Sequence, residues 1–143
     1  MSSVLLDTNL LVLLIIGLYD KNLINSHKRT TQFTIDDFEL LLKSIGGYEL
    51  LWVTSHCLAE VSNLLKQTNK SHAQQLLMFF KGFIFDKKES HVPKEIIFKE
   101  NIFMRLGVAD TGIIVKAKRV NCVFTVDLDL YLELSRRRYN EMV

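Results

Sequence analysis

The chain has 143 residues, 48% of them hydrophobic and 24% charged, and its formal net charge at pH 7 is +2. These are ordinary proportions for a globular protein that buries a core. With one proline and six glycines there is no linker rich in these residues and no low-complexity tract. We therefore expect a single domain over residues 1–143.

The cysteines and the longest apolar run bear on location. Cys57 and Cys122 lie in apolar segments and form no C-x-x-C pair, which predicts two buried thiols in a reducing compartment. The apolar run at 10–18 is shorter than the ~20 residues needed to cross a bilayer. No basic segment precedes it, so it is not a signal peptide. We expect a cytoplasmic protein without a membrane partner.

The first part of the chain alternates apolar and polar segments. Residues 4–6 are typical of a central parallel strand. The polar residues 7–9 supply the cap of a buried helix over 10–18, and a polar loop follows at 20–33.

The next helix begins at Thr34, with Asp37 completing an acidic variant of the capping box, and it stops at the two glycines 46–47. Residues 49–55 then predict a strand. Ser55 caps a helix that continues to about Gln67.

The remainder predicts four more helices and a strand. In chain order these are a helix that starts at Ser71 and covers 72–83, a helix over 94–106 with Pro93 in its first turn and Gly107 at its end, a helix over 109–119, a buried strand at 121–126 and a helix from Asp127 onward. Strands that alternate with helices indicate a three-layer α/β/α fold with a mainly parallel sheet.

Two aspartates follow predicted strands directly. Asp7 ends the first strand and Asp127 ends the last, so both are expected at the carboxyl edge of the sheet, where functional groups gather in such folds. Capping of the following helix is an equally good explanation for either residue alone.

Two further acids lie on predicted helices. Asp110 is in line with the apolar stripe that contains Ile114 and Ala117, which is a poor place for an acid that only packs. Glu60 lies at the rim of the apolar face of its helix, beside the polar His56; an ordinary boundary glutamate is the alternative. Four converging carboxylates would repel one another unless cations separated them, and oxygen-only ligands suit Mg²⁺ or Mn²⁺.

Four segments carry a family resemblance. The stretches "LLDTN", "SHCLAEVSNLL", "RLGVADTGIIVKAK" and "VFTVDLDL" together resemble the PIN-domain ribonucleases, which include the VapC-type toxins. The resemblance implies a PIN-like domain and a metal-dependent endoribonuclease. It implies that Asp7, Glu60, Asp110 and Asp127 are both the catalytic and the metal-binding residues, that Thr8, Asn9 and Thr125 support them by hydrogen bonds, and that Asp129 is an auxiliary acid.

The resemblance also implies partners: an RNA substrate, a second copy in a homodimer, and an antitoxin protein that restrains the enzyme. The apolar segments at 10–19 and 74–85 are candidates for such protein surfaces, and a monomer with a generous core is the alternative. Two features depart from the family pattern. Residues 20–48 lengthen the gap between Asp7 and Glu60, and the chain ends in a helix where a short strand is expected.

Other groups are weaker candidates. His56 is placed to reach a phosphate, although a surface histidine is the simpler interpretation, and Trp52 is expected in the core. Basic clusters at 27–29, 116–119 and 136–138 are either solvated faces or contacts for an RNA backbone.

Two other classes of function compete with cleavage. The first is a PIN-like module that binds RNA or protein without cleaving. The second is an aspartate-nucleophile phosphotransferase or receiver-like domain. The phosphotransferase pattern requires a second aspartate where Asn9 stands, and a receiver requires an acidic pair near Asp7 that the sequence lacks.

Overall fold

The computed structural model describes residues 1–142, and side chains as far as residue 138. A four-stranded sheet forms its centre, with every pair of neighbouring strands parallel and the order β3-β2-β1-β4. The strands are β1 (Ser3–Leu6), β2 (Leu50–Thr54), β3 (Lys88–Ser90) and β4 (Cys122–Phe124).

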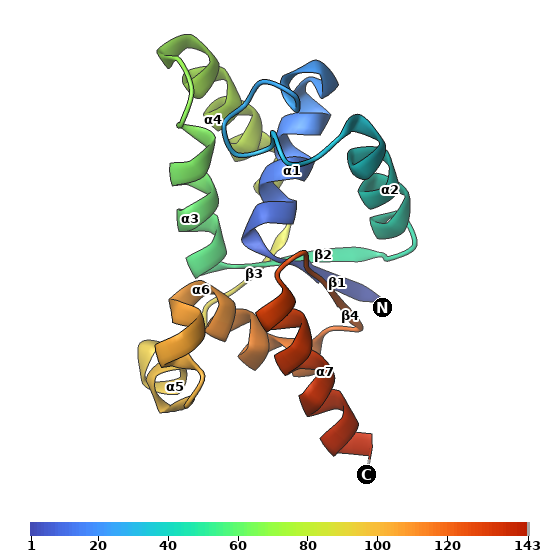
Figure 1. Ribbon diagram of the computed structural model, residues 1–143, viewed down its shortest axis with the longest axis vertical. Coiled ribbons are helices and arrows are strands. Elements are labelled where there is room, and N and C mark those ends of the chain that lie inside the picture. The colour runs from blue at the N-terminus through green and yellow to red at the C-terminus, as the bar shows by residue number, and fades with distance from the viewer. Residues whose placement is uncertain (143) are drawn as a thin grey trace.

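Helices cover both faces of this sheet. Figure 1 shows α1 to α4 on one side and α5 to α7 on the other, so the chain has the three-layer α/β/α fold that the sequence predicted. The helices are α1 (Thr8–Tyr19), α2 (Ile35–Ile45), α3 (Ser55–Leu65), α4 (Lys70–Ile84), α5 (Lys94–Lys99), α6 (Phe103–Lys116) and α7 (Leu128–Met142), with short 3₁₀ turns η1 (Lys21–Leu23) and η2 (Ala117–Arg119).

Each face of the sheet has its own hydrophobic core. Val4 and Leu6 of β1 face the first core, which is built around α1, whereas Leu5 faces the second core beneath α6 and α7. All residues from Leu10 to Ile16 are buried. The apolar side chains of α1 are therefore buried in the protein's own core. The segment 10–19 leaves little apolar surface exposed for a protein partner.

One close approach fixes α2 against α1. A methyl group built on Gly17 would lie 2.2 Å from the Phe38 ring, closer than two carbon atoms can pack. The glycine thus lets the Phe38 ring rest directly on the backbone of α1.

Several local predictions are confirmed. Thr34 and Asp37 form the capping box of α2. The chain also ends in a helix, α7, as expected. Gly107, with φ of 81°, ends one helical segment and precedes the next, as expected, and α6 spans both segments across this kink.

Other local predictions were wrong. Thr54, not Ser55, caps α3 by accepting the Cys57 N–H at 3.2 Å, because the Ser55 hydroxyl is bonded to Glu89 at 2.6 Å. Pro93 is the residue before α5 and not in its first turn.

The predicted helix over 94–106 is divided into α5 and the start of α6, with an extended backbone at Glu100. Ile97 and Ile102 both pack inward, but on one continuous helix their side chains would point about 140° apart. The break lets both side chains reach the interior.

The burial of three parts of the chain differs from the prediction. The loop 20–33 is polar in sequence, yet it buries Ile24, His27, Thr30 and Phe33. Trp52 and Cys122 were expected to be buried and are only half-buried, and both cysteines are free thiols. Among residues 1–142, no helix combines the length and the apolar character that crossing a bilayer requires.

Candidate functional site

Asp7 is the buried acid at the end of β1, with only 3% of its surface exposed. One carboxylate oxygen, Oδ1, accepts the Leu10 N–H at 2.8 Å and caps α1. The other, Oδ2, accepts the Thr125 hydroxyl at 2.5 Å and the Val126 N–H at 3.0 Å. A carboxylate has about four acceptor positions. Three hydrogen bonds therefore explain how this charge is tolerated in the interior, and they leave about one position free.

Asp127 is tied to the same network from the end of β4. Its backbone N–H donates to the Thr125 hydroxyl at 2.9 Å, and its carboxylate accepts the Leu130 N–H at 3.0 Å, which caps α7. Because β1 and β4 are paired neighbours, the two aspartates emerge at the same edge of the sheet. Both aspartates also cap helices. Each therefore has a capping role and also lies at the shared edge of the sheet.

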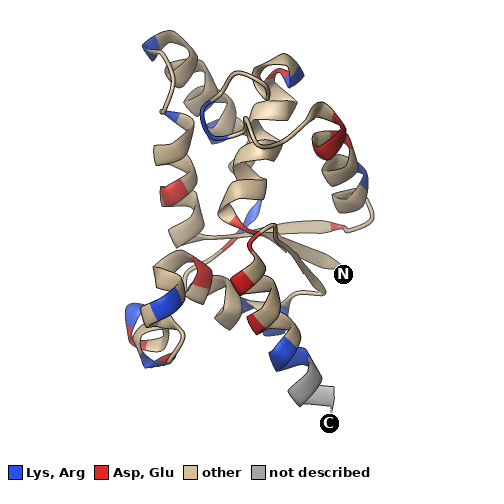
Figure 2. Ribbon diagram, viewed as in Figure 1, with Lys and Arg blue, Asp and Glu red and all other residues tan. Residues whose placement is uncertain are grey.

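Asp110 joins these acids from α6. Burial, and then the charges of Asp127, Asp7 and Glu60, raise the pKa of this half-buried carboxyl to about 6. In Figure 2 acidic positions on α3 and α6 and at the starts of α1 and α7 surround one region beside the sheet edge. The four acids thus come from four elements and influence one another.

Glu60 is the exposed member of the group. Cys57 lies one turn earlier on α3, and the charge of Glu60 acts on its thiol. Burial is the main cause that raises the pKa of the Cys57 thiol, and the charges of Glu60 and Asp110 raise it further, against hydrogen bonds with Thr54 and Thr8 that lower it. Glu60 therefore lies near Asp110, on the solvent side of the buried Cys57.

The four carboxylates do not form a finished metal site. Within residues 1–142, no three His, Cys, Asp or Glu side chains stand close enough together to hold an ion. The donor set itself suits Mg²⁺ or Mn²⁺, because it offers carboxylate oxygens alone. Burial is the main cause of the raised pKa of Asp110, and the repulsion by the other three acids adds to it; a divalent cation would relieve that repulsion. The residue types and charges fit such an ion, although the side chains would have to move together to bind it.

The residues predicted to support the acids behave differently from one another. Thr125 contacts Asp7 and Asp127, as described above. Thr8 is buried, but its hydroxyl lies 3.5 Å from the Cys57 sulfur and not against an acid. Asn9 and Asp129 are exposed in the first turns of α1 and α7, and no hydrogen bond joins them to the four acids in the described part of the chain.

Sequence reasoning missed two groups at this site. The backbone N–H of Val126 holds Asp7, and no side-chain pattern reveals that contact. Thr111, next to Asp110, is fully buried, and its hydroxyl has no hydrogen-bond partner among the described residues. Thr111 could have been noticed in the sequence, because it is a polar residue within the apolar stripe of α6.

His56 and part of the basic residues have other partners. The Nε2 atom of His56 lies 3.0 Å from the Val92 carbonyl oxygen, so the ring is tied to backbone. Arg136 and Arg137 pair with Glu133, which removes much of the charge of the cluster 136–138. Lys116 lies over the Trp52 ring, 4.1 Å from its centroid.

Comparison of the chain with protein-family models, with curated proteins and with solved structures gave no match.

Proposed function

We propose that this protein is a PIN-like, metal-dependent endoribonuclease that hydrolyses phosphodiester bonds in RNA. The observation that carries the proposal is the pair Asp7 and Asp127, joined through Thr125 at one edge of a parallel sheet. The charges of both aspartates and of Glu60 also act on Asp110 of α6. A purely structural role accounts for the capping by Asp7 and Asp127, but it gives no reason for Asp110 and Glu60 to approach them.

In this proposal Asp7, Glu60, Asp110 and Asp127 hold Mg²⁺ or Mn²⁺. A bound ion would supply Lewis acidity and activate water for phosphodiester hydrolysis. The protein's own contribution is positional: three hydrogen bonds fix the Asp7 carboxylate, and Thr125 aligns it with the Asp127 backbone. Glu60 is exposed and faces solvent, from which an RNA strand would arrive.

Protein partners are part of the proposal. A homodimer or an antitoxin needs accessible apolar surface, and α4 and its C-cap provide it through Met78 and Phe85, which are 76% and 88% exposed. The cytoplasm is the expected compartment, in keeping with two free thiols. A toxin restrained by an antitoxin would fit an RNA-cleaving enzyme of this kind.

One observation favours a second candidate, a PIN-like module that binds RNA or protein without cleaving. Asp7 and Asp127 already have structural roles as caps, and no three acids in residues 1–142 are assembled around an ion position. A domain that kept these acids for its fold alone would look similar at these two positions.

Incubation of labelled RNA with the protein in Mg²⁺, Mn²⁺ or EDTA separates the two candidates. Glu60→Gln is the sharpest variant, because Glu60 is exposed and its neutralisation leaves the packing intact. Asp36→Asn, also exposed but on α2, is the matched control. We expect cleavage by the wild type and the control in Mg²⁺ or Mn²⁺ only, and loss of cleavage in Glu60→Gln. Cleavage in EDTA contradicts the metal mechanism, and RNA binding without cleavage under all conditions favours the binding module.

A further inference from the structure

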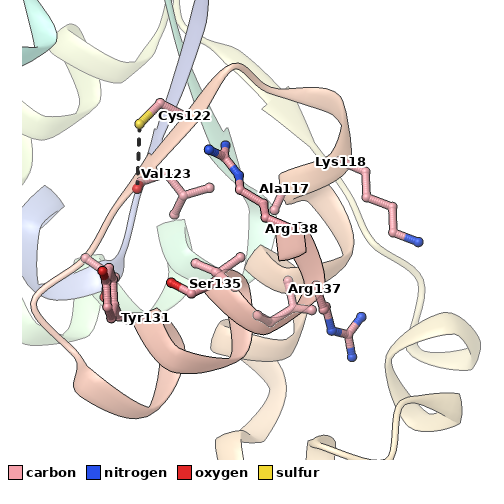
Figure 3. Close-up of a pocket in the computed structure, with 11 residues that line it drawn as sticks. Ala117, Lys118, Cys122, Val123, Tyr131, Ser135, Arg137 and Arg138 are labelled. Atoms are coloured by element: carbon pink, nitrogen blue, oxygen red, sulfur yellow. Dashed lines mark hydrogen bonds between the residues drawn. The ribbon is translucent and has the colours of Figure 1, made fainter. Parts of the chain in front are cut away.

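A pocket of about 140 Å³ lies beside β4, between that strand, the C-terminal half of α6 with η2, and α7. Its apolar lining includes Ile114, Val123 and Leu134, and Tyr131 stands at one end (Figure 3). Arg138 and Ser135 supply polar groups at the pocket, and Lys118 lines it while its side chain extends outward (Figure 3). The lining residues include three cations and no carboxylate.

The charge at this pocket is only partly balanced. Arg137 is paired with Glu100 at 2.7 Å and with Glu133 at 2.8 Å. Arg138 is exposed and donates to the Asn121 carbonyl oxygen at 3.1 Å, a neutral partner. Lys118 is exposed as well. The rim therefore offers positive charge to an anionic ligand, while the interior offers apolar surface.

Thr125 connects this pocket with the candidate active site. It is one of the lining residues, and its hydroxyl donates to Asp7. A ligand that fills the pocket thus lies next to the strand end from which the acids project. A chain with repeated negative charges could occupy the pocket with one unit and reach the acids with the next.

We propose that this pocket binds one nucleotide of a single-stranded RNA, an inference that rests on the proposed function and names a subsite of its substrate. The base packs on the apolar lining beside Tyr131, its phosphate contacts Arg138, and the exposed Lys118 side chain turns to contact the neighbouring phosphate. Single-stranded nucleic acids are commonly held in this way, with bases on aromatic or apolar groups and the backbone along cations.

An acidic peptide is the competing occupant, because β4 is one of the two outer strands of the sheet and, among the described residues, no strand pairs with its outer edge, which could accept an extended chain. Two features favour a nucleotide. Arg138 already occupies the Asn121 carbonyl, which lies just before β4, so backbone pairing is obstructed there. An apolar cavity with an aromatic side chain at its end also suits a flat base better than the carboxylates of such a peptide.

The test is the binding of a labelled six-nucleotide single-stranded RNA, measured by fluorescence anisotropy in EDTA, where the proposed cleavage cannot occur. Tyr131→Ala should weaken binding about tenfold through lost stacking. Lys118→Ala should reduce the magnitude of the salt slope of log K by about 0.7, the value for one phosphate contact on a single strand. Ser135→Trp, a change at an exposed rim position, should fill the pocket and prevent binding.

Matched controls are Leu40→Ala and Lys43→Ala, which alter exposed side chains of α2 outside the pocket lining and should bind as the wild type does. Wild-type affinity in Lys118→Ala, Tyr131→Ala and Ser135→Trp overturns the subsite, even if the protein cleaves RNA in Mg²⁺. Binding of a hexaglutamate peptide in place of RNA also overturns it. Pocket-dependent RNA binding without cleavage in Mg²⁺ or Mn²⁺ supports the subsite and contradicts the proposed enzyme instead.

Discussion

Thr125 donates a hydrogen bond to Asp7 across 118 positions of sequence, with 2.5 Å between the two oxygens. The same hydroxyl accepts the Asp127 N–H at 2.9 Å. One side chain therefore joins the acid that follows β1 to the acid that follows β4, and these strands are neighbours in the sheet. Thr125 is a positioning residue for both.

Thr125→Val should affect stability and activity together. It leaves the buried Asp7 carboxylate with one donor fewer, which should lower the free energy of unfolding by about 1–3 kcal/mol. Loss of a group that orients a metal ligand should lower cleavage about 10–100-fold. Thr125→Ser keeps the hydroxyl and should restore both. Urea denaturation and cleavage rates across a metal titration measure these effects, and a fully active Thr125→Val variant would remove the positioning role.

Asp110 should make stability depend on pH in metal-free buffer. Its pKa is about 6 in the folded protein against an ordinary 3.8, so between these values the folded state binds the extra proton. This contribution to stability is complete below about pH 4 and is lost as the pH rises through 6.

Asp110→Asn should therefore be more stable than the wild type at pH 7.5, by about 1 kcal/mol once solvent screening is allowed for, and the difference should shrink toward pH 4. Urea denaturation in EDTA at several pH values measures it. An advantage for Asp110→Asn that is equal at pH 4 and pH 7.5 would show that the pKa of Asp110 is not raised in the folded protein.

The fold could be predicted from the sequence where apolar runs and helix caps indicate the same element. The strand at 4–6, the capping box of Thr34 and the terminal helix each carry a local signal, and alternation of strands with helices then indicates a parallel sheet. β3 carries no such signal, because Lys88–Ser90 is polar and only its pairing with β2 makes it a strand. The break at Glu100 likewise depends on two isoleucines that must both reach the interior.

The candidate site could be predicted at the level of residues but not of contacts. Asp7 and Asp127 directly follow strands, which predicts their location at the edge of the sheet. Helical periodicity predicts that Asp110 lies on an inward face of its helix. What the acids contact depends on neighbours distant in sequence, such as the Val126 N–H and the Thr125 hydroxyl. The basic cluster 136–138 shows the same limit, because Glu133 pairs with two of its arginines only once α7 is formed.

Glu133 should be important for the placement of α7. Its side chain is only 5% exposed and is paired with Arg136 and Arg137, and Arg105 of α6 lies 3.6 Å away. Burial opposes ionisation, but hydrogen bonds from these two arginines lower the pKa of Glu133 below its usual 4.5. This stabilisation is therefore present above pH 4.5 and is lost as the pH falls through the lowered value.

Glu133→Gln should lower the free energy of unfolding by about 2 kcal/mol at pH 7, because it removes a charged acceptor from the arginines. Glu39→Gln is the matched control, since the Lys21–Glu39 pair is about half exposed and should contribute only about 0.5 kcal/mol. Thermal or urea denaturation at pH 7 and pH 3.5 measures both. Equal losses in the two variants would mean that burial gives the Glu133 pairs no added strength.

If the protein is a homodimer, α4 is the surface through which we expect it to associate. The other apolar segment, at 10–19, is enclosed by its own core, whereas Met78 and Phe85 are 76% and 88% exposed. They are seven positions apart, so they lie on one face of the helix and its C-cap.

The double change Met78→Glu with Phe85→Glu should convert a dimer to a monomer in light scattering, because it brings four like charges into the interface. Met104→Glu, an equally exposed position on α6 in the opposite layer, is the control and should remain dimeric. A wild-type protein that stays monomeric at high concentration contradicts the dimer, and dissociation by Met104→Glu alone would place the interface on the other layer.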